Sequence, residues 1–534
     1  LLLALAGVLL AVFVPMALRG GGGTAQLARE APLWLGLVLA ARWAAKGGRL
    51  LRGLAGSLFP PAILALALAA PLSGLRPHAA PPPGAAQVAA GHSGPIVVIG
   101  VDGLGWEMLE RWRNSGGSAD FDWLASRAAW GPLATVEPTR SPVIWTTIAT
   151  GRTPEDHGVL EFTSWRVSHL GRSLATIPRG LGAVYWMNLA QALGLVRLGP
   201  VTSQDVRCPR FWEIAGTAER PAAVAGWWCT WPASPVEGRL VSDKFYFWRD
   251  ARRAGLSDGG SLPPGVAYPP ELAGKLAELR VPPEAMSAEE VLRLIDIPEE
   301  EAATLAGRPY RHHDVLSELP LAYTMDRTWE NVARELLATG SPRGIYAFYL
   351  RGVDLLSHSA LAFSDLYPEI DSPADLRRRY GGLISRYLSL TFARVRRLIE
   401  AAGPDAAVLV VSDHGFEVIE HKRHGDPWPE FGHDHAPPGV FFALGPGVAP
   451  GPRRPTISVY DIAPTVLGLA GYPAAEDMPG RPLTEIFGEL DRSELRSRIA
   501  SYGQRSRAGA AGFDRAREAE GRELELLRSL GYID

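Results

Sequence analysis

An apolar stretch of the chain stops abruptly at an acid and a histidine, Asp413 and His414. The five residues at 407–411, Ala-Val-Leu-Val-Val, have the length and composition of a strand that is buried on both faces. A carboxylate and an imidazole beside a sheet core cost free energy unless a partner satisfies them, and a divalent metal ion would do so. The pattern therefore predicts a metal site at the end of this strand.

Two other apolar segments repeat this design. The segment 95–101 is followed by Asp102, and the segment 344–350 is soon followed by Asp354 and His358. In open α/β sheets ligands gather outside the carboxyl ends of the strands, so these residues can converge although they are far apart in sequence. The spacing of Asp354 and His358 puts both on one face of a helix, or at one metal after a tight turn.

A further histidine precedes a later apolar segment, in Phe-Gly-His-Asp-His-Ala-Pro at 431–437. We predict His435 as the ligand, with His433 as its close rival. Mixed Asp and His ligation suits zinc best and manganese or iron next, whereas calcium would take oxygen alone. The complete set of acids and histidines exceeds what one catalytic zinc needs and fits two ions that share a substrate.

Ser141 is the candidate nucleophile. It lies in Pro-Thr-Arg-Ser-Pro at 138–142, ahead of an apolar run that ends at Gly151, and this pattern predicts a helix beginning at the serine. The N-terminus of a helix favours both a developing alkoxide and a bound phosphate, and a metal contacting the hydroxyl would lower its pKa. Arg140 could hold a phosphate oxygen. The alternative is that Ser141 is only a structural N-cap.

The triplet Asp156-His157-Gly158 repeats the Asp-His-Gly pattern in a different context. It follows a polar segment instead of an apolar strand, so we do not predict metal ligands there. A lone Asp at a strand end is usually a turn former or a helix cap, and a lone His is usually a satisfied polar residue. The prediction of a metal site therefore depends on convergence, not on any single motif.

The composition is that of a globular protein. The 534 residues, of which 47% are hydrophobic and 21% charged, can form more than one domain and a large core. The net charge of −3, without a long basic run, argues against nucleic acid as the main partner. Cys208 and Cys229 make neither a disulfide scaffold nor a Cys-x-x-Cys metal site, and both free thiols and a mutual disulfide are compatible with the sequence.

The first 75 residues predict a membrane anchor. Residues 1–18 are almost uninterrupted apolar sequence, about the length that crosses a bilayer, and 31–45 and 58–75 are further apolar segments. Basic residues between the second and third segments favour a cytoplasmic loop, so the third span would place the rest of the chain on the extracytoplasmic side. A signal-peptide core and a hydrophobic core hairpin are the alternatives.

The rest of the chain predicts one large α/β domain. Residues 76–94, rich in Pro, Ala and Gly, read as a linker. We expect the catalytic domain at 95–490, with a largely parallel central sheet and helices on both faces. A helical insertion at about 245–339 would cover the sheet, a long helix at 376–402 would feed the strand described first, and 491–534 would form a helical tail.

In their order along the chain, these motifs resemble the type I phosphodiesterase/nucleotide pyrophosphatase family of the alkaline phosphatase superfamily. The resemblance spans about 95–487 and rests on Val-Asp-Gly-Leu at 101–104, Pro-Thr-Arg-Ser at 138–141, Thr-Gly-Arg-Thr-Pro-Glu-Asp-His-Gly at 150–158, Asp354 to His358, Ser-Asp-His-Gly at 412–415, His435 and Asp-Ile-Ala-Pro-Thr at 461–465. It implies an alkaline-phosphatase-like fold, two zinc ions and a covalent phospho-enzyme that water hydrolyses. It further implies one metal among Asp102, Ser141, Asp413 and His414, and the other among Asp354, His358 and His435.

One short stretch departs from the family pattern. Nucleotide pyrophosphatases have an Asn near the nucleophile that helps to bind the phosphoryl oxygen, and the equivalent position here is Ile144, which cannot donate. The next position, often His, is Trp145. This departure argues against nucleotide substrates. The aromatic run at 227–232, together with Trp145, indicates either an apolar-walled pocket or core packing.

The sequence therefore predicts a membrane-anchored, extracytoplasmic hydrolase of phosphate monoesters or diesters that uses two metal ions and Ser141. One alternative is a transferase that passes a phospho-headgroup from a lipid donor to an acceptor. Another is a non-catalytic member of the fold.

Overall fold

The computed structural model describes residues 89–505, except for 168–171, 174–190, 247–261, 306–307, 309, 312, 420–427, 434, 436, 453–456, 492 and 497. The chain divides into two units. Residues 164–199 belong to one of them, and the described residues 89–163 and 200–505 form the other, larger unit. The predicted membrane segments and most of the predicted linker lie outside the described residues. Within the part of the chain that the structure describes, no helix combines the length and apolar character that crossing a bilayer requires.

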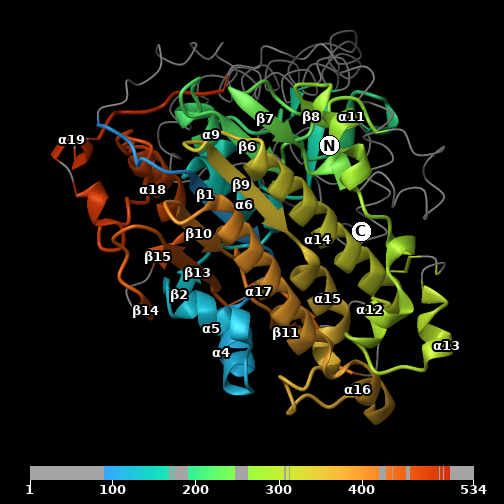
Figure 1. The fold of residues 1–534 in the computed structure, drawn as a ribbon. Helices are drawn as coiled ribbons and strands as arrows, with labels where there is room; N and C mark the ends of the chain where they lie inside the picture. Colours follow the sequence, from blue (N-terminus) through green and yellow to red (C-terminus); the bar gives the residue numbers. More distant parts are fainter. Residues whose placement is uncertain are drawn as a thin grey trace, which may run out of the picture. The chain divides into compact units, whose positions relative to one another are not determined.

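A ten-stranded sheet forms the centre of the larger unit (Figure 1). Its parallel inner strands are β10 (Ala407–Val411), β1 (Ile96–Val101), β9 (Ile345–Leu350), β6 (Ala222–Ala225) and β7 (Gly238–Val241). β1 lies between β10 and β9, so the three apolar segments that precede Asp102, Asp354 and Asp413 are neighbours. Their carboxyl ends therefore share one edge of the sheet.

Antiparallel and very short strands complete the two sides of this sheet. β13 (Gly439–Leu444) pairs antiparallel with β10, β2 (Ala129–Ala134) pairs antiparallel with β13, and β8 (Ala267–Tyr268) pairs antiparallel with β7. The two-residue strands β14 (Gly451–Pro452) and β15 (Ile457–Ser458) lie parallel to β2. The sheet is thus mostly parallel, with antiparallel strands toward its edges.

Both faces of the sheet are buried. In β1, Val97 and Ile99 belong to the core on one face, and Ile96 and Val98 belong to the core on the other. The first face is covered by α4 (Trp106–Asn114), α5 (Ala119–Ala125), α14 (Val315–Ala338), α15 (Gly352–Ala360) and α17 (Leu383–Ala402). The second is covered by α6 (Ser141–Thr150), α9 (Phe211–Ala215) and α18 (Ile462–Leu469). The predicted α/β fold, with a largely parallel sheet and helices on both faces, is confirmed.

The helix predicted at 376–402 is divided in two. α16 (Ala374–Tyr380) ends before Gly381 and Gly382, and α17 begins at Leu383. Glycine disfavours a helix interior, and the Gly381 carbonyl accepts a hydrogen bond from the Asp365 N–H instead of continuing a helix.

The predicted insertion at about 245–339 contains β8, several short helices and the 24-residue α14. The short elements are α11 (Leu272–Leu276), η1 (Ala277–Leu279), η2 (Pro283–Ala285), α12 (Ala288–Leu292) and α13 (Glu299–Ala302). α14 packs directly on β9, so this region supplies part of the layer that covers the sheet.

The remaining elements are short. The larger unit also contains α7 (Pro154–His157), η4 (Leu361–Phe363), β11 (Glu417–Ile419), β12 (Glu430–Gly432), η5 (Val459–Asp461), η6 (Gly488–Leu490) and α19 (Ser493–Arg496). A three-stranded sheet has the order β4 (Arg172–Ser173), β3 (Thr163–Val167) and β5 (Val196–Pro200), and all of its residues except Thr163 and Pro200 belong to the smaller unit. The predicted C-terminal tail lies outside the described residues after position 505.

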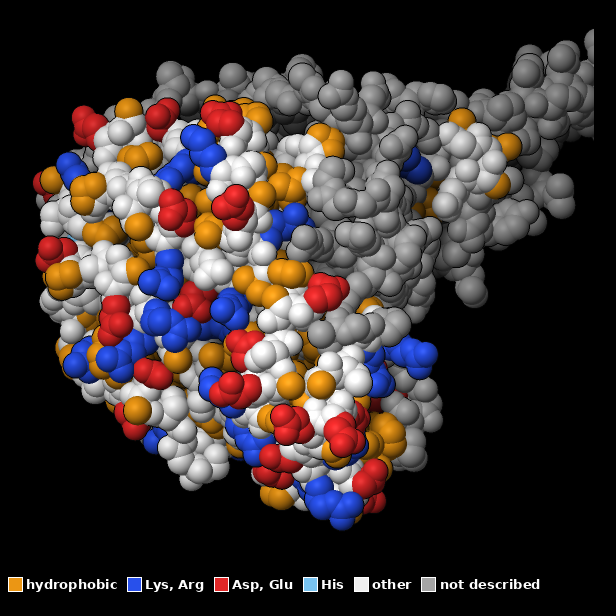
Figure 2. All heavy atoms as spheres, turned by 45° about the vertical axis from the view of Figure 1, so that its right-hand side comes forward, with side chains coloured by type: hydrophobic (Ala, Val, Ile, Leu, Met, Phe, Trp, Pro, Cys, Tyr) orange, Lys and Arg blue, Asp and Glu red, His pale blue; other side chains and the backbone are white. Residues whose placement is uncertain are grey.

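Basic and acidic side chains are interspersed over the described part of the face shown in Figure 2. Many such charges are paired at the surface, for example Arg386 Nη2 and Asp296 Oδ2 at 2.9 Å. This mixture agrees with the small net charge of the whole sequence.

Candidate functional site

The loops that follow β1 and β10 hold each other through side chains. Asp102 follows β1 directly, and Asp413 lies two residues after β10. The Gly103 N–H donates to Asp413 Oδ1 at 3.2 Å, and the Leu104 N–H donates to the Ser412 hydroxyl at 2.9 Å. Because the two strands are parallel neighbours, these bonds place both carboxylates side by side at one edge of the sheet.

His414 completes the first group of candidate ligands. Its Nε2 lies 3.5 Å from Asp102 Oδ1 and 3.3 Å from Asp413 Oδ2, and all three side chains are fully buried. Its Nδ1 lies 2.9 Å from the Gly415 carbonyl. A carbonyl can only accept, so Nδ1 carries the proton and the Nε2 lone pair faces the carboxylates.

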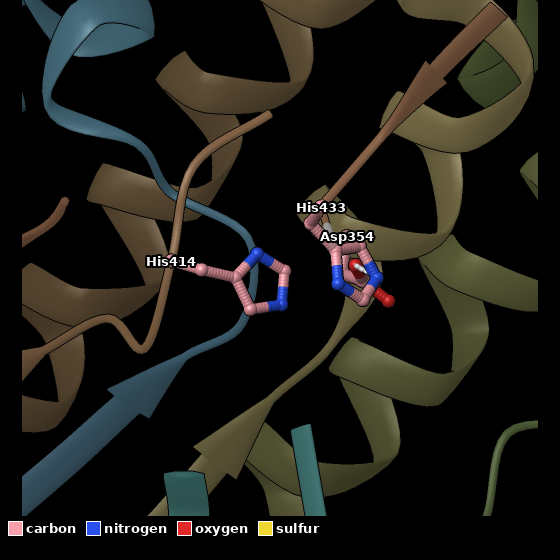
Figure 3. A group of neighbouring side chains, drawn as sticks. All are labelled: Asp354, His414 and His433. Carbon is pink, nitrogen blue, oxygen red and sulfur yellow. Dashed lines mark ion pairs between the residues drawn. The ribbon is translucent and has the colours of Figure 1, made fainter. Parts of the chain in front are cut away.

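The second group forms around α15. Asp354 and His358 lie one turn apart on this helix, with His358 Nε2 3.4 Å from Asp354 Oδ1. His433 Nε2 lies 4.0 Å from the same oxygen. Figure 3 shows the His414 side chain pointing toward Asp354 and His433, and the candidate ligand atoms of these three residues lie within 4.8 Å of one another. His414 therefore belongs to both groups.

The structure places His433 in this cluster and His435 outside it. His433 follows β12 and is 7% exposed, and its Nδ1 donates to the Thr139 carbonyl at 2.7 Å. The His435 side chain is 70% exposed and lies 3.4 Å from Glu137. The pairing of β12 with β11 explains why the two histidines differ in burial. It fixes the position of Gly432, the buried residue directly before His433, opposite Glu417 of β11. The Glu417 carboxylate in turn accepts a hydrogen bond from the His435 backbone N–H. The structure thus departs from our prediction of His435 and favours its rival.

Ser141 is the first residue of α6 and is fully buried. The N-cap position belongs to Arg140, and the helix ends at Gly151, which has a φ of 67°. Among the described residues the Ser141 hydroxyl has no hydrogen-bond partner, so it does not act as a helix cap. The Arg140 side chain lies 3.4 Å from Glu161 in an ion pair.

Two contacts connect the start of α6 to the ligand groups. Thr139, two residues before Ser141, accepts the hydrogen bond from His433. Trp145, one turn after Ser141, packs edge-on against Tyr349 with ring centroids 5.0 Å apart, and the Tyr349 hydroxyl donates to Asp102 Oδ2. Along the chain, Ser141 therefore lies between a residue that contacts His433 and a residue that contacts the tyrosine bound to Asp102.

Burial raises the pKa of the Asp102 carboxyl, and the nearby Asp354 adds to this rise. Burial also raises the pKa of Asp413 well above its usual value, helped by the charge of Asp102. For Asp354, burial is outweighed by His358, which holds the pKa below its usual value. Three carboxylates crowded into a buried cluster repel one another, so a bound cation would stabilise their charged forms.

The histidines are suited to the same cation. Burial, with a smaller effect of His414, lowers the pKa of His433 well below its usual value, so its imidazole is neutral. Asp102 Oδ1, Asp413 Oδ2 and His414 Nε2 are buried without hydrogen-bond partners among the described residues. These unsatisfied atoms are carboxylate oxygens and an imidazole nitrogen, which are suitable ligands for divalent ions such as zinc, manganese or iron.

Sequence reasoning missed Tyr349 and its neighbours. The Trp228 indole N–H donates to the Tyr349 hydroxyl at 2.7 Å, and the Arg351 guanidinium lies over the Trp228 ring at 4.8 Å. Arg351 Nε also lies 4.0 Å from Asp354 Oδ2. A tyrosine at the buried end of a strand signals that its hydroxyl needs a partner, but the sequence does not say which one.

The aromatic run at 227–232 packs into the core. Trp227 and Trp231 are almost fully buried, and Trp227 packs edge-on against Trp145 with ring centroids 5.1 Å apart. This packing supports the core alternative over an apolar-walled pocket.

The second Asp-His-Gly triplet has a structural role. His157 ends α7 and is fully buried, and its Nε2 lies 3.0 Å from the Thr147 hydroxyl of α6. The Val159 N–H donates to Nδ1 at 3.2 Å, so both ring nitrogens are used within the protein. The triplet is in neither group of candidate ligands found among the described residues.

Acids and histidines at the carboxyl ends of parallel strands lie where open α/β sheets bind their ligands. The family model described as type I phosphodiesterase / nucleotide pyrophosphatase matches residues 96–454, and the chain belongs to this family. The resemblance drawn from the motifs is thereby confirmed. Family membership supports a phosphoester hydrolase of the alkaline phosphatase superfamily.

The chain is also similar to several solved structures. It is 12% identical to murine ectonucleotide pyrophosphatase / phosphodiesterase 5 in complex with AMP, over 74% of this chain and 99% of that one, with a TM-score of 0.39. A substituted form of the alkaline phosphatase PafA is 12% identical over 74% and 99% of the two chains, with a TM-score of 0.43. Phosphonoacetate hydrolase from Sinorhizobium meliloti is 17% identical over 63% and 59%, with a TM-score of 0.33. No curated protein matches the chain.

Proposed function

We propose that the protein is a metal-dependent phosphoester hydrolase in which Ser141 is the nucleophile. The observation that carries this proposal is the buried Ser141 hydroxyl, which has no hydrogen-bond partner among the described residues. The same turn of chain contacts His433 through Thr139, and Trp145 contacts the tyrosine that binds Asp102. A buried hydroxyl costs free energy when it is unsatisfied, and a metal ion or a phosphoryl group bound at this site would satisfy it.

The residues divide into two half-sites for divalent ions, most simply zinc. Asp102, Asp413, His414 and Ser141 would hold one ion, and Asp354, His358 and His433 would hold the other. Ions bound there would supply Lewis-acid chemistry, neutralising charge on the phosphoryl oxygens and favouring the ionised form of a hydroxyl.

The serine would then perform the reaction in two displacements. Attack of Ser141 Oγ on phosphorus forms an Oγ–P bond and breaks the bond to the leaving alcohol. Water then cleaves the Oγ–P bond and releases phosphate from a monoester or a monoester from a diester. Ser141 lies in the first turn of α6, where the helix dipole favours a bound phosphoryl group.

The side chain of Ile144 gives information about the class of substrate. It is fully buried in α6, one turn from Ser141, and has no side-chain donor for a phosphoryl oxygen. We therefore propose phosphate esters other than nucleotides as substrates.

The decisive experiment compares wild type with Ser141→Ala on paired aryl phosphate monoesters and diesters, with and without a chelator. We expect the variant to lose roughly 10³-fold or more in kcat, and wild type to lose activity with the chelator. Ser118→Ala is the matched control, because Ser118 is a true N-cap whose hydroxyl accepts from the Phe121 N–H at 3.2 Å. Its removal should cost about 1 kcal/mol of stability and leave turnover unchanged. Equal activities of Ser141→Ala and Ser118→Ala would refute the proposal that Ser141 is the nucleophile.

We also propose that residues 1–75 anchor the enzyme in a membrane with its catalytic domain on the extracytoplasmic side. The apolar segments and the basic loop between them support this arrangement. The full chain should then require detergent for extraction. Recovery of the full chain in the aqueous fraction without detergent would contradict the anchor.

A further inference from the structure

The helix that carries Asp354 and His358 is capped by a residue from another helix. The cap position of α15 is Arg351, whose side chain makes no capping hydrogen bond. Instead, Oδ1 of Asp326, in α14, accepts from the Arg351 N–H at 2.9 Å and from the Gly352 N–H at 3.0 Å. Backbone N–H groups at the start of a helix have no acceptor within the helix, so Asp326 supplies the acceptor that these two N–H groups need.

Asp326 is fixed in turn by a third helix, α17. The Tyr387 hydroxyl donates to Asp326 Oδ2 at 2.9 Å and also lies 3.0 Å from the Ala322 carbonyl. Arg394 Nη1 lies 3.6 Å from the same Asp326 oxygen, and both side chains are buried. The carboxylate therefore has one oxygen for α15 and one for α17.

Close packing leaves this junction little freedom. A Cβ atom at Gly352 would collide with the Tyr387 hydroxyl and would lie 2.5 Å from Asp326 Oδ2. α15 can approach Asp326 this closely only because its first residue is glycine. The position of the helix start is thus determined jointly by Asp326 and Tyr387.

We propose that Asp326 is a positioning residue for the second metal half-site, which it sets through the start of α15. The inference rests on the two half-sites proposed above. Asp354 and His358 lie in the first two turns of this helix, whereas His433 and His414 come from other parts of the chain. A shift of the helix start moves two ligands relative to the others, and metal geometry tolerates only about 0.5 Å of such movement.

If Asp326 only held α14 to α17, other residues of the same helix-to-helix network would affect metal binding equally. Glu330 is the control residue for this alternative. Glu330 lies one turn after Asp326 in α14 and binds the same Arg394 at 3.5 Å, together with Arg397 at 2.5 Å. Its described ion-pair partners are in α17, so it shares the helix-to-helix network without capping α15. Loss of Glu330 should lower stability without affecting the ligands.

The test is equilibrium Zn²⁺ binding to the full-length, metal-stripped protein in competition with a chromogenic chelator. Wild type should bind two ions. Asp326→Ala should weaken one of them by about 10-fold, as is typical of outer-shell partners, and leave the other unchanged. Glu330→Gln should leave both affinities unchanged.

Asp326→Asn should rescue binding. The amide oxygen can still accept from both backbone N–H groups, and the amide nitrogen can donate to the Tyr387 hydroxyl, which keeps its bond to the Ala322 carbonyl. Gly352→Ala keeps Asp326 but displaces the helix start, so it should reproduce the selective loss even if Asp326→Ala does not fold.

Wild-type affinities in both Asp326→Ala and Gly352→Ala would overturn the inference, as would equal weakening by Asp326→Ala and Glu330→Gln. A wild-type protein that binds no Zn²⁺ would instead overturn the proposed metal site itself, and with it the inference.

Discussion

The imidazole rings of His414 and His433 are stacked, with centroids 4.0 Å apart and planes 18° apart. The two residues follow different strands, and each directs its Nδ1 proton to a backbone carbonyl, that of Gly415 or Thr139. Both Nε2 atoms are therefore available as ligands, one beside Asp102 and Asp413 and the other beside Asp354. The pair joins the two groups of candidate ligands into one cluster.

Substitution of His433 by alanine should remove one of two bound zinc ions. His433 is a buried neutral imidazole in the cluster. Its removal should therefore lower the zinc affinity by more than the roughly 10- to 100-fold that outer-shell changes cause. Metal content after dialysis and zinc competition measure the effect. His435→Ala is the control, because that side chain is largely exposed and should leave both ions bound. A loss of zinc in His435→Ala alone would show that His435 is the ligand.

Removal of the Tyr349 hydroxyl should weaken the ion beside Asp102. This hydroxyl orients Asp102 by donating to Oδ2 and is itself fixed by the Trp228 indole. Tyr349→Phe should cost about 10-fold in zinc affinity for that ion, measured by chelator competition. Tyr346→Phe is a matched control from the same strand, since the Tyr346 hydroxyl donates to the Ser341 carbonyl, near the start of that strand. Equal affinities in the two variants would argue against this role.

His157 should make the folded state sensitive to acid. Burial, and then the charges of Arg207, Arg152 and Arg210, lower the pKa of His157 from 6.5 to about 3. Below pH 6.5 His157 is protonated in the unfolded chain but stays neutral in the folded protein. The free energy of unfolding therefore decreases as the pH falls below this value. The loss is about 1.4 kcal/mol per pH unit, or about 2 kcal/mol between pH 7.5 and about pH 5.

The measurement is the free energy of unfolding in urea at both pH values, with chelator present so that metal release does not contribute. His157→Asn can still donate to Thr147 but does not titrate. It should be less stable than wild type at pH 7.5 and should lose about 2 kcal/mol less on acidification. Parallel pH curves for the two proteins would contradict the assignment.

The inner strands and the acids at their ends could be predicted from the sequence. The apolar runs that became β1, β9 and β10 are local signals, because strands buried on both faces need consecutive apolar residues. Parallel neighbours end at the same edge of a sheet, so the proximity of Asp102 and Asp413 follows once the strands pair. The break between α16 and α17 also has a local signal in the sequence, in the consecutive glycines Gly381 and Gly382.

The sequence by itself determined which segments form the sheet and which acids and imidazoles are available at its edge. Only the tertiary structure decided which imidazole turns inward, because His433 and His435 differ by two positions in one loop and the choice depends on a carbonyl of Thr139 and on the pairing of β11 with β12. It also decided that the Ser141 hydroxyl does not cap its helix and that Asp326 caps another one. Hydrogen bonds between distant segments leave no periodic trace in the sequence, whereas burial of a strand does.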